Sequence, residues 1–183
     1  SLAKLLLTVE RALEADRLAQ ENVGLKRRSS TVIEPIGHSP AIQRLREQVK
    51  RVAQHDSWVL IAGEPGSGRE TFARYLHAHS SRRDRPFIEV GVSAISRGNA
   101  APELFGSERD GDIHYGRLEQ ASGGTLFLDE IADMDLEAQA QLVGALDTGS
   151  FMRVGGSASV DVDVRVIAAT QRDLQHAVEE GKF

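Results

Sequence analysis

The sequence contains no cysteine, which excludes disulfide bonds, thiolate metal sites and cysteine nucleophiles. This absence also fits a reducing compartment. No apolar run approaches the roughly 20 residues that a membrane helix needs, and the first residues lack the basic start and small-residue cleavage site of a secretory signal. We therefore expect a soluble, cytoplasmic protein that does not contact a membrane.

An excess of positive charge is also missing. The chain has 22 Lys and Arg residues against 27 Asp and Glu residues, which gives a formal net charge of −5. Bulk electrostatics therefore do not draw it onto nucleic acid or an anionic lipid surface. Its 183 residues, of which 40% are hydrophobic, suffice for one domain with a core and a short appendage.

The appendage is a predicted helix over residues 1–28. Leu2, Leu6, Val9 and Leu13 recur at helical spacing and share one face. Such a stripe does not say what it packs against. Two interpretations stay open: a surface helix on its own domain, or a linker helix that pairs with a second copy. Residues 29–36 then form a polar linker that contains a proline.

Strands and helices alternate along the rest of the chain. Short apolar runs predict buried strands at 58–62, 86–90, 125–128 and 165–169, and apolar spacing predicts helices at 70–79, 136–146 and 173–180. Residues 151–154 and 159–162 are typical of a hairpin. This order predicts an α/β fold with a parallel sheet flanked by helices on both faces.

One more helix is predicted from its start signals. Ser39 is a suitable N-cap, and Pro40 occupies the first helical position, where its missing N–H costs nothing. The buried face of this helix is predicted to consist of Ile42, Leu45, Val49 and Val52.

The segment GEPGSGRET at 63–71 lies between a predicted strand and a predicted helix, the context that a phosphate-binding loop requires. Gly63, Gly66 and Gly68 allow the backbone to approach a ligand closely. Successive N–H groups can then face phosphate oxygens at the positive end of the helix. The usual pattern ends in Lys followed by Ser or Thr, whereas this chain has Arg69 and Glu70. Taken alone, the segment could also be a glycine-rich turn.

Asp129 and Glu130 follow an apolar strand and favour the first interpretation. Their position predicts two carboxylates at the carboxyl edge of the sheet, beside the glycine-rich loop. Asp129 could hold Mg²⁺ there, directly or through water. Glu130 could orient or deprotonate the water that attacks a γ-phosphate. The alternative, a solvated strand end, is weakened by the upstream loop and by Gly123–Gly124 just before the strand.

Two other groups of residues give weaker signals. Arg82, Arg83 and Arg85 form a basic turn, and most such runs are solvated. A role of this turn facing a neighbouring subunit is the alternative. His77 and His79 lie two residues apart on a predicted helix, so they do not converge on a metal.

Five sequence blocks together resemble the central AAA+ domain of sigma-54-dependent transcriptional activators. They are GEPGSGRE at 63–70, ELFG at 103–106, GGTLFLDEIADM at 123–134, RVGG at 153–156 and VDVRVIAATQRDL at 162–174. The resemblance runs from about Ile36 to Phe183. The first residues resemble the last helix of a receiver domain. We therefore expect residues 1–32 to be receiver end and linker, and residues 33–183 to be the core subdomain of a response regulator of the NtrC/NtrX type, without lid or DNA-binding domain.

This resemblance implies a ring-forming ATPase that binds ATP or ADP with Mg²⁺ between subunits and remodels RNA polymerase carrying sigma-54. It implies that Ile36 and Gly37 lie against adenine and that Asp129 binds the metal. Glu130 and Gln171 are the implied catalytic residues. The implied phosphate-binding residues are Gly63, Glu64, Pro65, Gly66, Ser67, Gly68, Arg69 and Glu70.

Three single residues depart from the family pattern. Arg69 replaces a Lys, and its planar fork is not equivalent to an ammonium at a phosphate site. Gly91 replaces an Asn that restrains the catalytic Glu in the family. Gln171 replaces an Asn and carries its amide one methylene further out. We therefore expect hydrolysis to be impaired more than binding.

The sigma-contacting motif GAFTGA should follow ELFG, but this chain continues SERDGDIHYGRLEQ. We expect this segment to be a plain surface connection. A branch of the family of the NtrX type also lacks the motif. Its absence argues against sigma-54 RNA polymerase as a partner.

The sequence therefore favours a module that binds ATP or ADP without efficient hydrolysis. An active sigma-54 ATPase and an empty scaffold for oligomerisation are the alternatives. Expected partners are a second copy of the chain, through the linker helix or a nucleotide-dependent ring, and a sensor kinase through the receiver. DNA is expected to be contacted only through a domain that these residues do not include.

Overall fold

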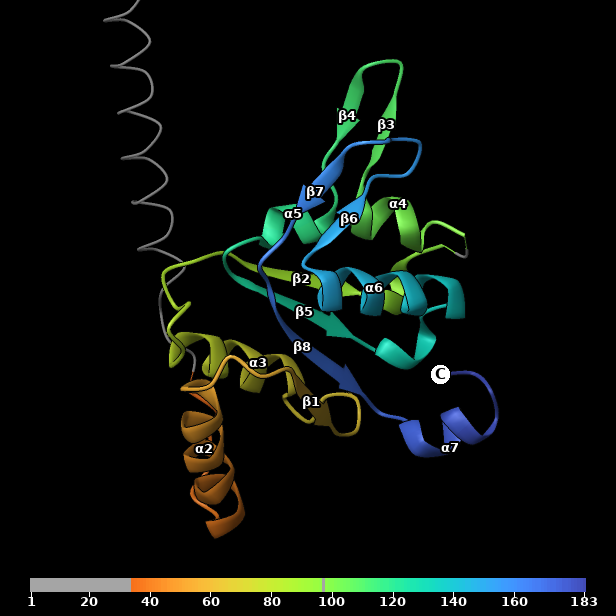
Figure 1. Cartoon of the computed structure of the whole chain (residues 1–183). Helices are drawn as coiled ribbons and strands as arrows, with labels where there is room; N and C mark the ends of the chain where they lie inside the picture. The colour runs from red at the N-terminus through yellow and green to blue at the C-terminus, as the bar shows by residue number, and fades with distance from the viewer. Residues whose placement is uncertain (1–33, 97) are drawn as a thin grey trace, which may run out of the picture. The chain divides into compact units, whose positions relative to one another are not determined.

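The computed structural model describes residues 34–96 and 98–183, shown in Figure 1. The predicted helix over residues 1–28 and most of the linker after it lie outside the described residues. Within the described residues, no helix combines the length and apolar character needed to cross a bilayer.

A four-stranded sheet forms the centre of the fold, in the order β1-β8-β5-β2. The strands are β1 (Val59–Ala62), β2 (Phe87–Gly91), β5 (Thr125–Asp129) and β8 (Arg165–Thr170). Every neighbouring pair is parallel. The four strands predicted from apolar runs and the parallel sheet are therefore confirmed. No strand boundary differs from its predicted position by more than one residue.

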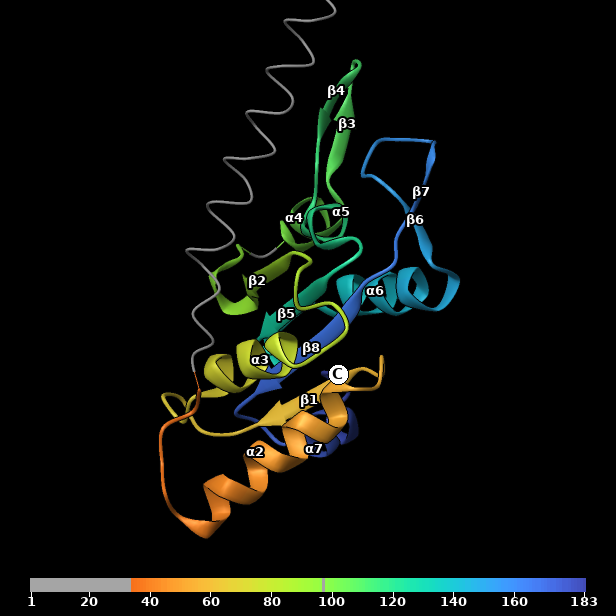
Figure 2. The ribbon, with the colours of Figure 1, turned by 90° about the vertical axis from the view of Figure 1, so that its left-hand side faces the viewer.

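Side chains alternate between the two faces of this sheet, and helices cover both. On one face, Phe127 and Ile167 pack with Ala73 and Leu76 of α3 (Arg69–Ala78) and with Ala53 at the end of α2 (Pro40–Ala53). On the other face, the core is larger and is built on Leu126, Leu128 and Val166. Figure 2 shows α3 and α6 on opposite sides of the sheet.

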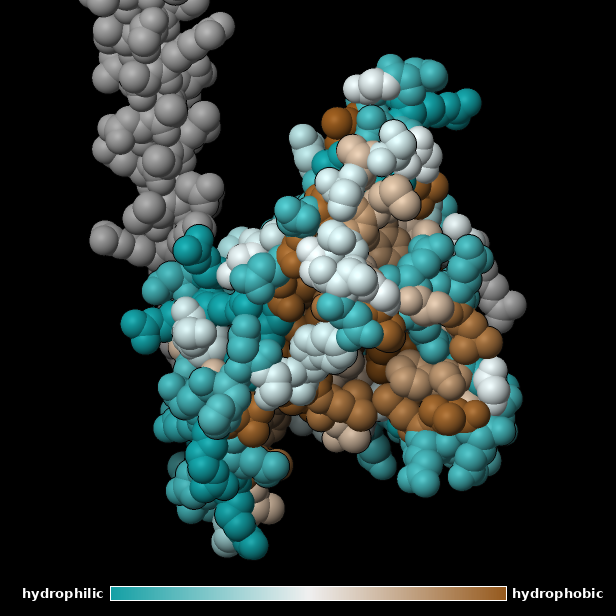
Figure 3. All heavy atoms as spheres, in the orientation of Figure 1, coloured by the Kyte–Doolittle hydropathy of each residue, from teal (hydrophilic) through white to brown (hydrophobic). Residues whose placement is uncertain are grey.

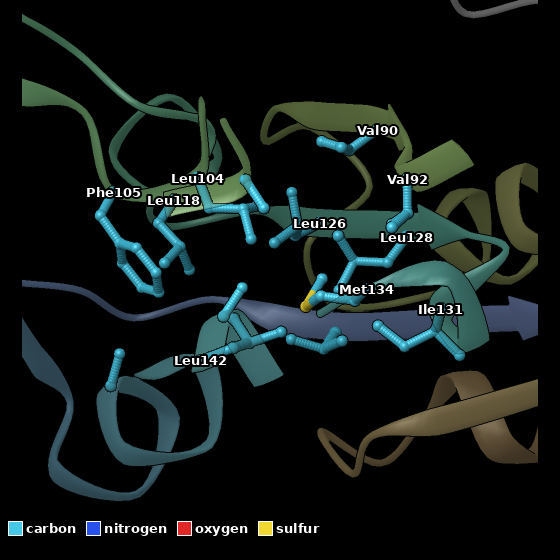
Figure 4. Packing of buried hydrophobic residues seen from close by; sticks show 14 of the residues in the cluster. Val90, Val92, Leu104, Phe105, Leu118, Leu126, Leu128, Ile131, Met134 and Leu142 are labelled. Carbon is cyan, nitrogen blue, oxygen red and sulfur yellow. The ribbon is translucent and has the colours of Figure 1, made fainter. Parts of the chain in front are cut away.

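The larger core is completed by three helices, α4 (Ala100–Phe105), α5 (Arg117–Ala121) and α6 (Leu136–Thr148). Leu104, Leu118 and Leu142 point from these helices toward the leucines of β5 in Figure 4. Leu104, Leu118, Leu126 and Leu128 are fully buried at 0% exposure. The core therefore covers both faces of β5, the strand that ends at Asp129.

The start of α2 agrees with its sequence signals. Ser39 accepts a hydrogen bond from the Ile42 backbone N–H at 3.3 Å, and Pro40 is the first helical residue. The predicted buried face is wrong at Leu45, which is 44% exposed. The apolar contact with the sheet is made near the end of the helix instead, where Ala53 is only 1% exposed.

At the amino edge of the sheet, Arg165 fixes the end of α2. This first residue of β8 is 1% exposed and donates to the carbonyls of Val52 at 2.9 Å, Ala53 at 3.1 Å and Ser57 at 3.2 Å. The carbonyls of Val52 and Ala53 are among those that the end of α2 leaves without an intrahelical partner. The apolar run from which β8 was predicted did not indicate that Arg165 binds the end of α2.

Arg82 lies at the same edge and corrects the prediction of a solvated basic turn. Its guanidinium donates to both oxygens of Asp56, at 2.9 and 2.6 Å, and to Asp163 Oδ1 at 2.8 Å. It also reaches the carbonyls of Gly124 at 3.3 Å and Asp163 at 3.2 Å. Its side chain is only 11% exposed. Arg82 therefore ties together the segments that enter β1, β5 and β8.

His77 of α3 is buried against the first residue of β5. Its Nε2 lies 3.2 Å from the Arg85 carbonyl, which can only accept, so Nε2 carries the proton. Its Nδ1 then accepts from the Thr125 hydroxyl at 2.8 Å. Burial lowers the pKa of His77 below its ordinary value, which favours the neutral ring.

Two hairpins leave the same region of the domain. One is formed by β3 (Ser107–Arg109) and β4 (Asp112–His114). Asp110 and Gly111 join these strands with φ of 51° and 84°, which is typical of a two-residue type I′ turn. The predicted surface connection is therefore an antiparallel hairpin, whose strands were not predicted. Aspartate followed by glycine is a hairpin signal that the sequence contained.

The second hairpin, β6 (Ser150–Met152) with β7 (Ser159–Asp161), confirms its prediction. It is attached to the first by hydrogen bonds from the Glu108 N–H to the Val154 carbonyl at 2.9 Å and from the Val154 N–H to the Gly106 carbonyl at 3.0 Å. Figure 1 shows both hairpins rising from the domain, and Figure 3 shows hydrophilic side chains at the tip of β3–β4. The remaining elements are η1 (Val92–Ala94), η2 (Ile131–Asp133) and α7 (Leu174–Glu179).

Candidate functional site

The topology brings most of the predicted site residues to the carboxyl edge of the sheet. Gly63 follows β1, Gln171 follows β8, and Asp129 ends β5. Because these three strands are parallel, their carboxyl ends meet at one edge. A hydrogen bond of 3.0 Å from the Gly63 N–H to the Thr170 carbonyl joins the first two of these ends.

The loop after β1 has the backbone of an anion cradle. Gly66 and Gly68 take φ of 78° and 90°, which side-chain-bearing residues rarely adopt. A Cβ at Gly63 would lie 2.6 Å from Ser67 Oγ, so a side chain here would require the serine hydroxyl to move. Gly68 is the N-cap of α3 and provides no side chain to its first turn. The first N–H groups of the helix are thus left for a ligand.

Arg69 connects this loop to the acidic end of β5. Its Nη1 donates to the Gly63 carbonyl at 3.1 Å, and its Nη2 donates to Glu130 Oε1 at 2.5 Å. The same Nη2 lies 3.2 Å from Asp129 Oδ1. Since β8 lies between β1 and β5, the side chain crosses the end of β8 to make these pairs. It is 9% exposed.

Glu130 is held in an unusual conformation. Its φ of 57° and ψ of 50° place a residue with a side chain in the left-handed region. Its Oε2 lies 3.5 Å from the Gln171 N–H, while Oε1 accepts from Arg69. Its own N–H donates to Asp129 Oδ1 at 3.1 Å. Both carboxylate oxygens of Glu130 therefore face donors. Backbone strain of this kind tends to occur at functional sites.

Gln171 is connected to the site by its backbone. Its side-chain amide makes no hydrogen bond to another of the described residues, and the residue is exposed. The fixed polar side chain at this strand end is instead that of Thr170, the last residue of β8, which is 1% exposed and accepts from the Arg172 N–H at 3.0 Å. The predicted catalytic role of the Gln171 amide stays a prediction.

Ile36 and Gly37, the residues predicted to lie against adenine, are anchored separately. Arg46 of α2 donates to the carbonyls of Pro35 at 3.0 Å and Gly37 at 2.9 Å. Ile36 is 96% exposed. Within the described part of the chain, no hydrogen bond or ion pair links this segment to the loop. Its contact with a base also stays a prediction.

Gly91 stands directly beside Asp129 in the pairing of β2 with β5. Its φ is −80°, which any residue can adopt. A Cβ added here would meet only the Ala94 Cβ, at 4.0 Å. The backbone therefore does not require glycine, and its effect is to leave open space next to the acidic pair.

A charged group beside the loop was not predicted. Arg74 donates to Glu70 at 2.7 Å and to Glu89 of β2 at 2.8 Å. Burial, and next the nearby charge of Glu70, raise the pKa of Glu89 above its ordinary value. The spacing of Glu70 and Arg74, four residues apart on a helix, was a signal for the first pair. Glu70 of the loop is thus connected to β2 through Arg74.

The acidic pair fits a divalent cation poorly. A metal needs carboxylate oxygens that are free to coordinate it, and Asp129 and Glu130 both face the Arg69 guanidinium. Over residues 34–96 and 98–183, no cluster of three His, Asp or Glu side chains is arranged around a common point.

A hollow of about 680 Å³ lies elsewhere, between the η1–α4 segment and the start of α6. Val92, Pro102, Met134 and Ala138 contribute to its lining. None of the predicted site residues lines it. The glycine-rich loop with its acidic partners is thus the better candidate site.

Known proteins are similar to this chain in sequence and in fold. Residues 35–183 match the family described as "Sigma-54 interaction domain". The DNA-binding transcriptional regulator NtrC of Salmonella typhimurium is 44% identical over 180 residues, which cover 96% of this chain and 38% of that protein. A P-loop NTPase domain from E. coli, with a TM-score of 0.56 and 24% identity over 78% of this chain and 85% of that one, supports the fold.

Solved structures of NtrX from Brucella abortus are similar at 40% identity over 100% of this chain. The complex with ADP has a TM-score of 0.79, and 41% of its chain is covered. The complex with ATP has a TM-score of 0.77, and 42% of its chain is covered. The chain therefore spans about two fifths of the length of NtrC and NtrX. The match over residues 35–183 shows that the chain belongs to the sigma-54 interaction domain family.

Proposed function

We propose that this chain binds ATP or ADP on the loop Gly63–Glu70 and that binding is more efficient than hydrolysis. The glycine conformations and the open N-terminus of α3 support a phosphate site. The solved complexes of the similar NtrX with ADP and ATP support the class of ligand.

The observation that carries this proposal is the engagement of Glu130. In hydrolysis by a P-loop enzyme, a polar side chain must orient or deprotonate the attacking water. Here one oxygen of Glu130 accepts from Arg69 at 2.5 Å and the other lies 3.5 Å from the Gln171 N–H. The guanidinium of Arg69 therefore competes with a water for Glu130.

For the whole protein we propose a transcription regulator that contacts DNA through a region outside these residues, as the name of the similar NtrC suggests. Self-association and control by a sensor kinase are part of the same proposal. Remodelling of sigma-54 RNA polymerase is not, because a tight hairpin with Asp110 at its turn stands where GAFTGA was expected. Its hydrophilic tip (Figure 3) differs from an apolar contact loop.

Calorimetric titration with ATP and with ADP, together with a phosphate-release assay, tests the proposal. We expect binding of both nucleotides and slow release that Glu130→Gln changes little. Glu137→Gln, an exposed substitution in the first turn of α6, is the matched control. Fast release that Glu130→Gln abolishes would establish an active ATPase instead. Lack of binding at millimolar nucleotide by the folded protein would favour an empty scaffold.

A further inference from the structure

We propose that the Arg69 guanidinium takes the place of a divalent cation in this site, so that the chain binds ATP without Mg²⁺. This inference rests on the proposed nucleotide binding and concerns its metal requirement. It follows from the position of one side chain that the sequence pattern assigns to the phosphates.

The guanidinium lies where a metal would need to meet the acidic pair. Its Nη2 is 2.5 Å from Glu130 Oε1 and 3.2 Å from Asp129 Oδ1. Exposure is 9% for the Arg69 side chain, 12% for that of Glu130 and 32% for that of Asp129. Solvent therefore screens the contact with Glu130 little and the contact with Asp129 more. The single guanidinium faces both carboxylates and neutralises one of their two negative charges.

A magnesium ion would have to compete with this group for Asp129 Oδ1 and Glu130 Oε1. Mg²⁺ requires close, nearly octahedral oxygen coordination and holds its own water tightly. Asp129 Oδ1 already accepts from the Glu130 N–H at 3.1 Å and faces Arg69 on the other side. A cation bound to this oxygen would lie next to the guanidinium, and like charges at that distance repel.

Arginine can make this bridge because of its shape. Its planar fork carries five N–H groups, so it can reach several acceptors at once, whereas lysine offers one compact ammonium. Arg69 uses Nη1 for the Gly63 carbonyl and Nη2 for the acidic pair. Its Nε makes no hydrogen bond to another described residue. The guanidinium can thus stay paired with the carboxylates while its Nε–H donates to a phosphate oxygen.

Lysine at this position would leave a different site. Its ammonium could move to the phosphates and release Asp129 and Glu130 for a metal. The substitution Arg69→Lys is therefore expected to create a dependence on Mg²⁺ that the natural chain lacks. Arg83→Lys makes the same change at a side chain that is 69% exposed and pairs only with its neighbour Asp84. It serves as the matched control.

The experiment is calorimetric titration of the three proteins with ATP, once with millimolar Mg²⁺ and once with excess EDTA. We expect the dissociation constants of the natural chain and of Arg83→Lys to agree within about twofold between the two conditions. Arg69→Lys is expected to bind at least about tenfold more tightly with Mg²⁺ than with EDTA. Asp129→Asn in the Arg69→Lys background should remove that gain.

The possible outcomes distinguish failure of the metal-independence inference from failure of the proposed nucleotide binding. Loss of ATP binding by the natural chain in EDTA, with binding in Mg²⁺, would overturn the inference and leave the proposed function standing. An Arg69→Lys variant that is folded by circular dichroism and equally insensitive to Mg²⁺ would also overturn it. Absence of binding by the folded natural chain in both conditions would instead defeat the proposed function itself.

Discussion

The two edges of the parallel sheet each hold an arginine paired with two carboxylates. At the carboxyl edge, Arg69 pairs with Asp129 and Glu130. At the amino edge, Arg82 pairs with Asp56 and Asp163. The two arginine side chains are similarly covered, at 9% and 11% exposure. The same chemistry therefore occurs at both ends of the strands.

The surroundings of the two arginines differ. Arg82 also donates to two backbone carbonyls, so nearly all its donors serve the protein. Its carboxylate partners are 57% and 80% exposed. Arg69 stands beside a loop of glycines in left-handed conformations and a helix N-terminus without a side-chain cap. One edge is a structural clamp, and the other combines a charge pair with unused N–H groups. Substitutions at the two edges are therefore expected to change different properties of the protein.

The largest effect is expected from Arg82→Ala, which removes the clamp. Loss of its charged hydrogen bonds should lower the free energy of unfolding by about 2 kcal/mol. Affinity for ATP should stay unchanged, because the lost contacts lie at the opposite edge from the loop. Urea unfolding at pH 7 and calorimetry give the two quantities. Arg83→Ala, one residue away and exposed, is the control.

The pH dependence of the same variant sharpens the test. The hydrogen bond from Arg82 lowers the pKa of Asp56 below its ordinary value. The stability that this pair supplies is therefore present above the ordinary pKa of an aspartate and is lost as the pH falls below it. The gap between the natural chain and Arg82→Ala should narrow in acid. A constant gap would show that the clamp acts by packing alone.

Arg69→Ala is expected to differ from Arg82→Ala in its effect on ATP binding. Two carboxylates without their guanidinium would then face the phosphates, and ATP affinity should fall by at least about tenfold. The free energy of unfolding should also fall, because Glu130 is only 12% exposed and loses its charged partner. A variant that loses stability but keeps its affinity would show that both edges are structural clamps.

His77 provides a smaller effect at the amino edge. Its pKa is lowered by burial, so the unfolded chain binds the proton more strongly than the folded one. Stability should be full above the ordinary histidine pKa of about 6.5 and should fall below it, by at most about 1.4 kcal/mol per pH unit. His77→Gln should flatten this part of the curve. Unfolding at pH 7.5 and pH 5.5, with exposed His55 changed to Gln as control, measures the difference.

The smallest effect is expected for Gly91→Asn at the carboxyl edge. The φ of −80° and the open space around a Cβ at this position leave the free energy of unfolding within about 0.5 kcal/mol of the natural value. ATP affinity should also change little, since Arg69 already engages Glu130. A large gain in phosphate release would show that the missing amide, rather than the arginine, limits hydrolysis.

Most of the sheet was predictable from local pattern. The four parallel strands and α2, α3, α6 and α7 were predicted because short apolar runs and helical spacing record burial directly. The short helices α4 and α5 were not predicted, since each spans fewer than two turns and is held in place by the core around Leu104 and Leu118. The β3–β4 hairpin was missed although Asp110–Gly111 is a turn signal.

Within the site, the sequence identified the loop, Asp129, Glu130 and Arg69 as neighbours. It did so because parallel strands deliver their carboxyl ends to one edge, whatever the details of packing. It did not reveal that Arg69 crosses the end of β8 to reach the acidic pair. Nor did it reveal that Gln171 approaches Glu130 through its backbone N–H.

Sequence by itself thus determined the order of elements, the edge at which the site lies and the residue types that meet there. The tertiary structure alone decided which charges pair. The sequence alone does not distinguish the roles of three arginines, Arg69, Arg82 and Arg165. Each donates hydrogen bonds to the acceptors that the fold places within reach. The order of the strands in the sheet determines which acceptors lie near each arginine. Hydrogen bonds and ion pairs depend on distances in space, and these cannot be read from positions along the chain.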